Sequence, residues 1–159
     1  RIAHIAGWEG ASTQRDREAG FIAGLNAAGQ SLYARAVSDF NFEQAKAVAR
    51  DMFCAAEIPD AVFCANDHMA FAVMDVLRFE LGLSVPGDVS VVGYDDVMLA
   101  AWPSYDLTTV RQPAGQMAQS CVDILMDRLS DPDTKPRRVA LDGPLIIRGS
   151  ARIPKGWTS

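Results

Sequence analysis

Polar side chains follow the apolar runs of this 159-residue chain, and they are the residues best able to do chemistry. The segment SVVGYDDVML, residues 90–99, is the clearest case, because a run of β-branched and small residues stops there on two carboxylates, Asp95 and Asp96. Carboxylates accept hydrogen bonds from hydroxyl groups, arginine and amides donate to oxygen, and an aromatic ring stacks on an apolar face. Residues of these kinds follow the other apolar runs as well: Thr13, Arg17, Ser38, Asp39, Phe40, Asn66 and Asp67.

The apolar runs alternate with segments that have helical periodicity. Strands separated by helices of about ten to fifteen residues are typical of βαβ units and a parallel sheet. The chain is therefore predicted to be an α/β protein, a three-layer αβα sandwich. The expected strands are residues 2–6, 34–37, 61–65, a run within 85–96, 108–110, 138–141 and 145–147, and the expected helices lie within 12–29, 41–53, 68–82 and 116–129.

Local signals predict where two of these helices begin. Thr13 with Asp16, and Asn41 with Gln44, have the spacing of a capping box, in which the first residue caps the helix. Gly29 is the expected stop of the first helix, because glycine readily adopts the left-handed conformation found there.

In an open parallel sheet, ligands bind in the crevice beyond the carboxyl ends of the strands. Because side chains alternate along a strand, we expect Asp95 to face a ligand and Asp96 to cap the helix that starts near Val97. Asn66 and Asp67 are interpreted in the same way, as ligand contact and helix cap. The alternative at 95–96 is that both residues are caps or solvated loop charges, and at 66–67 that both are caps.

Two further residues have a functional and a structural interpretation. Arg17 is expected in the first turn of a helix, where the helix dipole disfavours a positive charge, so it is interpreted as a ligand contact. A surface salt bridge is the alternative. Phe40 is either an aromatic surface in the pocket or a hydrophobic staple for the following helix.

Composition excludes some classes of protein. The net charge is −5 with no basic face, so this chain by itself is a poor binder of nucleic acid. No apolar run approaches the roughly 20 residues that span a bilayer, so no membrane association is expected. Cys54, Cys64 and Cys121 are far apart in apolar contexts, which predicts buried, reduced thiols and a cytoplasmic protein. Because the first residue is Arg1, we expect a piece of a longer protein.

Signals for an enzyme are missing from the sequence. There is no phosphate-binding loop, no GxGxxG after a strand and no GxSxG elbow. His4 and His68 have no partners at the spacing of a zinc site. The chain is therefore predicted not to be an enzyme, and neither a metal nor a cofactor is expected.

Five motifs in order resemble the lactose-repressor (LacI/GalR) family of bacterial transcription regulators: REAGF, PDAVFCANDHMA, VPGDVSVVGYDD, LTTVRQP and IIRGSAR. The resemblance covers nearly the whole chain. It implies a core like that of periplasmic sugar-binding proteins, built from two lobes, behind a helix-turn-helix head. It also implies homodimers whose affinity for operator DNA is shifted by a small effector, often a sugar.

The same resemblance divides the chain into parts. Residues 1–110 are similar to the C-terminal lobe, and 111–135 to a crossover strand and helix that belong to the N-terminal lobe. Residues 136–152 resemble strands that return to the C-terminal lobe, and 153–159 form a tail. Operator DNA would then be bound only through a head outside this chain. The apolar face of the crossover helix (Met117, Cys121, Ile124 and Leu125) would lack its partner, so we expect it to repack, swap between chains or drive association.

The family's effector contacts map onto Arg17, Asn66 and Asp95, the three residues that the strand ends also select. The resemblance adds Phe40 as a pocket aromatic, and Thr13 and Gln112 at the periphery. A contact often found just after that glutamine has no clear match here, because Pro113 and Ala114 stand there. The effector itself is not identified by these residues.

The expected function is the effector-binding and dimerisation region of a LacI-type regulator, with a carbohydrate as effector. The alternative is a periplasmic sugar-binding protein of a transport system, which shares the fold. The unpaired cysteines and the ending LTTVRQP…IIRGSAR favour the regulator. The gene upstream of Arg1 would decide, because a regulator has a helix-turn-helix there and a transport protein a signal peptide.

Overall fold

The computed structural model describes residues 1–154, and its centre is one six-stranded sheet. The strands are β1 (Ile2–Ala6), β2 (Leu32–Val37), β3 (Ala61–Cys64), β4 (Ser90–Asp95), β5 (Thr108–Arg111) and β6 (Leu145–Ile146), in the order β2-β1-β3-β4-β5-β6. The first five are parallel, and only β6 is antiparallel to its neighbour. The predicted α/β fold with a parallel sheet is confirmed.

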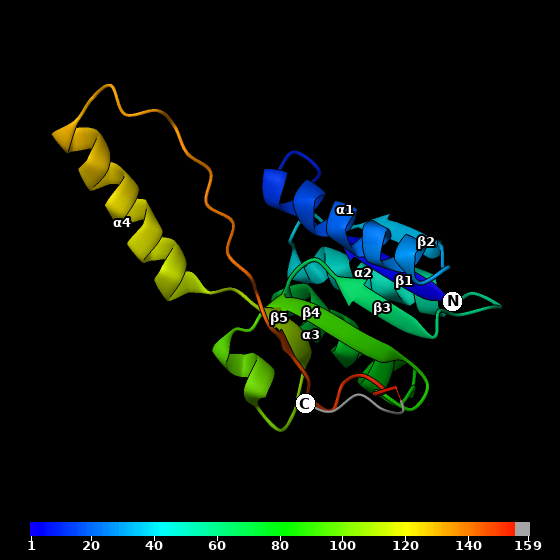
Figure 1. The fold of residues 1–159 in the computed structure, drawn as a ribbon. Helices are drawn as coiled ribbons and strands as arrows, with labels where there is room; N and C mark the ends of the chain where they lie inside the picture. Colours follow the sequence, from blue (N-terminus) through cyan, green and yellow to red (C-terminus); the bar gives the residue numbers. More distant parts are fainter. Residues whose placement is uncertain (155–159) are drawn as a thin grey trace.

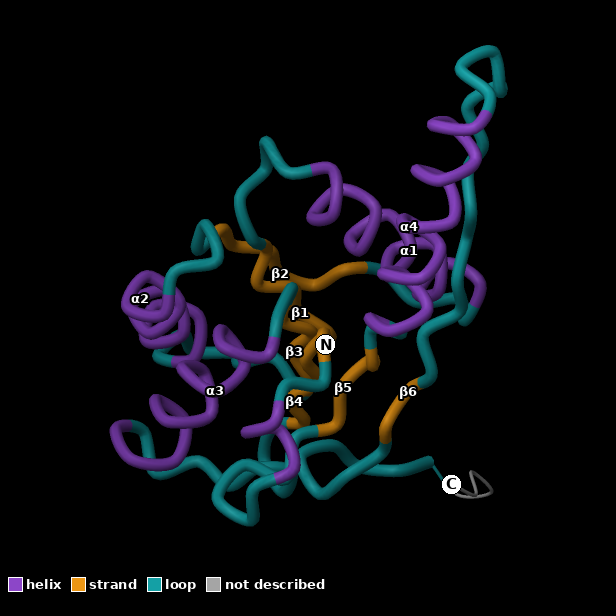
Figure 2. Tube along the Cα trace, turned by 90° about the vertical axis from the view of Figure 1, so that its left-hand side faces the viewer, coloured by secondary structure: helices purple, strands orange, loops and turns teal. Residues whose placement is uncertain are grey.

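Helices cover both faces of this sheet (Figure 2). On one face lie α2 (Phe42–Phe53) and α3 (Asp67–Asp75), which continues into the π-helical turn η1 (Val76–Glu80); α1 (Ser12–Ala27) lies on the other. A short 3-10 helix, η2 (Met98–Ala101), follows β4. The main apolar core lies between the sheet and the α2–α3 layer and contains Ile5, Phe53, Met69, Met74 and Leu77. Because both faces are covered, the strands read as nearly continuous apolar runs.

The capping predictions had different outcomes. Asn41 caps α2, since its side chain accepts from the backbone N–H of Gln44 at 3.0 Å. The capping box at Thr13 and Asp16 was wrong, because α1 begins at Ser12, two residues earlier than a cap at Thr13 implies, and is preceded by Ala11, whose side chain cannot cap. Gly29 has a φ of +68°, which confirms the left-handed stop after α1.

The burial predicted for the cysteines was wrong for two of the three. Cys64 on β3 is fully buried, and burial raises the pKa of its thiol. Cys54 follows the end of α2 and Cys121 lies on α4, and both are exposed. Apolar sequence neighbours do not bury a residue when its own helical position faces solvent.

Helix α4 (Ala114–Ser130) stands away from the rest of the molecule (Figure 1). None of its residues is buried, and its exposed apolar side chains are Met117, Val122, Leu125, Met126 and Leu129. The segment 131–144 that returns from it is mostly exposed and irregular, so the strand predicted at 138–141 is not formed. Within residues 1–154, no helix combines the length and apolar character needed to cross a membrane. Most of the tail predicted at 153–159 lies outside the described residues.

We predict that the apolar side of α4 drives self-association of this chain. Leu125 is 57% exposed near the middle of that side, and water-exposed apolar area of this extent favours contact with another apolar surface. Leu125→Glu is expected to weaken association measured by sedimentation velocity over a concentration series. Gln116→Glu adds the same charge on the polar side of α4 and should leave association unchanged. A wild-type chain that stays monomeric at every concentration would contradict the prediction.

Candidate functional site

Arg17 of α1 and Asp95 at the end of β4 form an ion pair beyond the strand ends. Arg17 Nη2 lies 3.0 Å from Asp95 Oδ1, and the two side chains are 13% and 22% exposed. Gln112, just after β5, donates from Nε2 to the same Oδ1 at 2.5 Å. Arg17 also donates to the carbonyl of Ala65 at 2.6 Å and stacks over the Tyr94 ring, 4.0 Å from its centre. Four contacts therefore hold the guanidinium and the carboxylate in one arrangement.

This arrangement leaves hydrogen-bonding atoms free for a ligand. Both protein bonds to Asp95 fall on Oδ1, so its Oδ2 remains an acceptor without a partner among the described residues. Gln112 Oε1 and Arg17 Nε likewise make no hydrogen bond within that part of the chain. Two acceptors and one donor next to each other suit a molecule with several hydroxyl groups.

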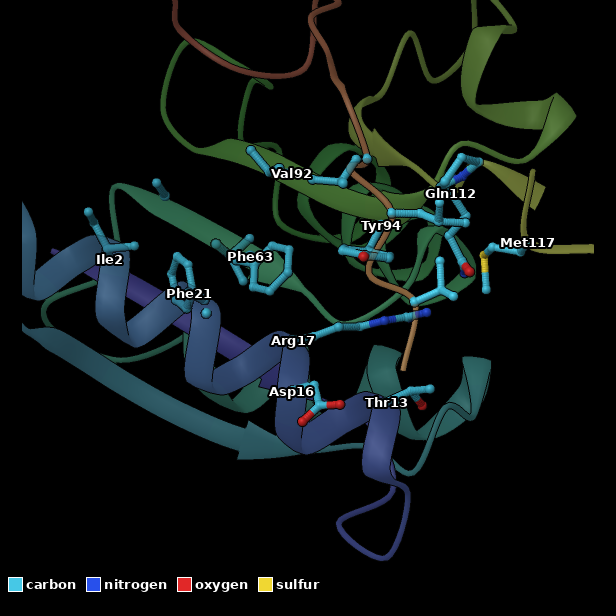
Figure 3. Close-up of a pocket in the computed structure, with 18 residues that line it drawn as sticks. Ile2, Thr13, Asp16, Arg17, Phe21, Phe63, Val92, Tyr94, Gln112 and Met117 are labelled. Carbon is cyan, nitrogen blue, oxygen red and sulfur yellow. The ribbon is translucent and has the colours of Figure 1, made fainter. Parts of the chain in front are cut away.

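A cavity of about 680 Å³ opens beside this ion pair (Figure 3). Its polar end is formed by Thr13, Arg17 and Gln112, three of the residues predicted from the sequence. Its remaining walls are mostly apolar, and Phe21 of α1 faces Phe63 of β3, with 4.7 Å between ring centres. A concave, mostly apolar site with a few convergent polar groups is typical of small-molecule binding. The lining residues are Ile2, Thr13, Asp16, Arg17, Gly20, Phe21, Ala61, Val62, Phe63, Val92, Tyr94, Val110, Gln112, Pro113, Met117, Val139, Leu141 and Gly143.

The other predicted residues, Asp95, Asn66 and Phe40, are not among those that line the cavity. Asp95 is bonded directly to two of the lining residues, Arg17 and Gln112. Asn66 follows Ala65, whose carbonyl Arg17 contacts. Phe40 follows β2, and its ring lies directly over Gly7, where an added Cβ would be only 2.2 Å from the ring.

The capping role predicted for Asp67 was wrong. Asn66 is the cap of α3, since its Oδ1 accepts from the backbone N–H of Met69 at 2.9 Å. The Asn66 amide nitrogen makes no hydrogen bond within residues 1–154. Asp67 is fully buried and bonds to Val97 and Thr109 instead.

The capping role predicted for Asp96 was also wrong. No side chain caps η2, and the Asp96 carboxylate pairs with Arg111 Nε at 2.5 Å and Arg148 Nη2 at 2.7 Å. Burial raises the pKa of Asp96, but the hydrogen bonds and charges of the two arginines outweigh burial and hold that pKa below its ordinary value. Asp96 thus ties β4 to β5 and to the segment after β6.

Positive φ angles explain why the alternation of side chains along a strand gave the wrong role for Asp96. Asp95 has a φ of +123° and Asp96 a φ of +56°, so the chain leaves β geometry at the carboxylates. Asp39 and Phe40 after β2 are also left-handed, at +53° and +57°. Non-glycine residues rarely adopt positive φ, and such residues concentrate at functional sites.

Buried hydrogen bonds fix α1, and with it Arg17, against the sheet. Gln14 accepts from the backbone N–H of Gly7 at 2.7 Å and donates to Glu18 at 2.9 Å. His4 Nδ1 lies 2.9 Å from the carbonyl of Phe63, which can only accept, so Nδ1 carries the proton. His4 Nε2 then accepts from Gln14 Nε2 at 3.3 Å, which requires a neutral imidazole.

Comparison with known proteins gives this arrangement a family. The periplasmic binding protein-like domain matches residues 1–151. The chain belongs to this family. The HTH-type transcriptional repressor PurR of Photobacterium profundum is 34% identical over 154 residues, which are 96% of this chain and 46% of that protein.

Solved structures agree with this assignment of the periplasmic binding protein-like domain. A complex of the transcriptional regulator CelR with cellobiose is 36% identical, with a TM-score of 0.87 over 95% of this chain and 46% of the other. A lac repressor dimer bound to operator and an anti-inducer is 30% identical, with a TM-score of 0.87 over 95% and 52%. The resemblance to LacI-type regulators is thereby confirmed. The chain spans about half the length of the curated relatives it matches.

Sequence reasoning found only Thr13, Arg17 and Gln112 among the lining residues, and it missed Tyr94 and one internal connection. Tyr94 stacks on Arg17, and it lies two residues after Val92, which lines the same cavity, so both side chains are on one face of β4. The bond from Thr109 to Asp67 at 2.6 Å had no signal, because it joins residues far apart in the sequence.

Asp96→Asn is expected to destabilise the domain by about 3 kcal/mol at pH 7, because it leaves Arg148, which is largely buried, without its counter-charge. Urea unfolding measures the loss, with Asp133→Asn on the exposed segment as a control. Since the folded-state pKa of Asp96 is lowered, the stabilisation is present above about pH 4 and disappears as pH falls through the folded value. Equal stabilities of the two variants would refute this role.

His4 makes the stability of the fold depend on pH in a second range, at higher pH than Asp96 does. Burial lowers the pKa of His4 in the folded state, against the hydrogen bond to Phe63 and the charge of Glu18. The unfolded chain therefore takes up a proton near pH 6.5 that the folded chain does not, and stability should fall by up to about 1 kcal/mol from pH 7 to 5.5. Denaturant unfolding of His4→Gln should lack this slope, whereas the exposed-residue control His68→Gln should keep it.

Proposed function

We propose that this chain is the effector-binding C-terminal lobe of a LacI-type transcription regulator, and that the effector is a small neutral carbohydrate. The observation that carries the proposal is the group formed by Arg17, Asp95 and Gln112 at the strand ends. Asn66, Phe40 and Thr13 complete the proposed site at the neighbouring strand and helix ends. The site supplies binding groups and no nucleophile, so the proposed activity is recognition rather than catalysis.

The charges of the site support a polyhydroxylated, uncharged ligand. Asp95 already balances the guanidinium of Arg17, so an approaching ligand meets no net charge from this pair. Asp95 Oδ2 and Gln112 Oε1 would accept from two hydroxyl groups, and Arg17 Nε would donate to a ring or hydroxyl oxygen. The CelR structure with cellobiose is an example of a sugar bound by a protein of this fold.

The proposed mechanism is closure of two lobes on the effector. Met117 of α4 lines the cavity, and the apolar side of α4 would pack in an N-terminal lobe of the longer protein. A ligand that bridges both lobes binds the closed form better and shifts the population toward it. In a homodimer this shift would change the spacing of the two DNA-binding heads, and hence affinity for operator DNA.

The proposed partners and location follow from the same reading. A lac repressor related to this chain is a dimer bound to operator, which supports a homodimer that reads DNA through a head outside this sequence. A regulator of this kind acts in the cytoplasm, where the DNA is. No observation favours the transport protein over the regulator.

Thermal unfolding in the presence of candidate ligands tests the proposal. The panel contains D-ribose, D-galactose, cellobiose, sugar phosphates and purines, with the longest chain that can be produced. A ligand at about a hundred times its Kd should add roughly 2.7 kcal/mol of stability. We expect one neutral sugar to raise the Tm of the wild type and not that of Asp95→Asn, because the amide loses the charge that pairs with Arg17 and has an NH2 donor in place of the free Oδ2 acceptor.

Asp51→Asn is the matched control, because Asp51 is an exposed carboxylate on α2 far from the cavity. It should respond to the sugar as the wild type does. A shift that survives in Asp95→Asn would remove Asp95 from the site. No shift with any neutral sugar in a chain that contains both lobes would refute the proposed function.

A further inference from the structure

Asp67 is a buried carboxylate that connects three strand ends. Asp67 is fully buried at the start of α3, three residues after the end of β3. Oδ2 accepts from the backbone N–H of Val97, just after β4, at 2.9 Å, and Oδ1 accepts from the hydroxyl of Thr109 on β5 at 2.6 Å. Within residues 1–154 it forms no ion pair, so these two donors are what satisfies its oxygens. Burial raises the pKa of Asp67, and both hydrogen bonds oppose that rise.

Gly93 on β4 makes room for this carboxylate. A Cβ at position 93 would lie 2.3 Å from Asp67 Oδ1 and 2.9 Å from Leu107 Cδ2. Gly93 is the residue paired with Thr109 across β4 and β5, so the glycine and the hydroxyl donor lie side by side in the sheet. The glycine of VVGYDD is therefore explained by a close approach of Asp67, without any need for unusual φ.

Val97 follows the turn that carries Asp95, whose carboxylate is proposed to contact the ligand. Asp95 and Asp96 have left-handed backbone between β4 and Val97, a conformation that costs about 1–3 kcal/mol per residue and persists only when neighbouring contacts hold it. The bond from Val97 to Asp67 fixes the exit of this turn, and β4 fixes its entry. With both ends fixed, Asp95 can direct Oδ1 to Arg17 and Gln112 and keep Oδ2 free.

We propose that Asp67 is the positioning residue of the effector site: its bond to the Val97 amide, and not its bond to Thr109, holds the left-handed turn that presents Asp95. The inference rests on the proposed function for Asp95. It adds that Asp67, although buried, contributes to the affinity for the effector. Asp67 itself is proposed to touch no ligand, because it is fully buried and both of its carboxylate oxygens accept hydrogen bonds from the protein.

Two variants separate positioning from general stability. Asp67→Ala removes the acceptor for Val97, whereas Thr109→Val removes only the hydroxyl partner and keeps the bond to Val97. Both should lower the Tm, since each leaves a buried polar group unpaired. Only Asp67→Ala should weaken binding of the panel sugar that most stabilises the wild type, by about tenfold or more, when calorimetric titration is run well below both melting temperatures.

A measurement without ligand makes the test independent of the proposed function. The side-chain N–H signals of Arg17 in 15N-labelled protein report its bond to Asp95. They should be resolved in the wild type and in Thr109→Val, and averaged in Asp67→Ala. If no panel sugar binds the wild type while these signals behave as expected, the proposed function fails and the positioning role of Asp67 stands.

If Asp67→Ala does not fold, hydrogen exchange of the Val97 amide in the wild type still tests the bond from Val97 to Asp67. The amide should be protected, and equally so in Thr109→Val. Free exchange of Val97 in the folded wild type would overturn the proposal. So would unchanged sugar affinity and unchanged Arg17 signals in a folded Asp67→Ala, or a loss of affinity in Thr109→Val as large as that in Asp67→Ala.

Discussion

The parallel sheet places the carboxyl ends of β1 to β5 at one edge, and the polar residues that follow must satisfy one another there. The ion pair between Arg17 and Asp95 is the central interaction at this edge, because it joins α1 on one face of the sheet to the end of β4. Two more carboxylates are satisfied beside it, Asp96 by arginines and Asp67 by a backbone amide and a hydroxyl. Each of the three has its own partners, which is why three acidic residues can lie together at this edge.

Much of the fold could be predicted because its signals are local. Apolar runs and glycine stops predict the first five strands and their helices to within a few residues, and the parallel topology predicts that Arg17 and Asp95 lie at the same edge of the sheet. The separate roles of Asn66, Asp67 and Asp96 could not be predicted. They depend on positive φ values after β4 and on contacts with Thr109 and Arg148, and neither has a signature in neighbouring residues.

The region from α4 to β6 shows that sequence patterns predict a helix more reliably than a strand. Its helix was predicted closely, because amphipathic periodicity alone favours a helix. The strand expected at 138–141 has the right composition, but a strand needs a paired neighbour, and this segment pairs with no strand among the described residues. A pattern of alternating residues predicts that a segment can form a strand. Whether it does so depends on whether the rest of the fold supplies a strand to pair with.

The left-handed turn at Asp95 and Asp96 has a further consequence for recognition. A loop that is free before binding loses conformational entropy when a ligand orders it, and that loss lowers affinity. Here the backbone is confined to one conformation as the domain folds, so its entropy is lost before any ligand arrives. If the proposed effector binds at this turn, its acceptors are already in place, so the few hydrogen bonds that a small ligand forms there would count almost in full toward its affinity.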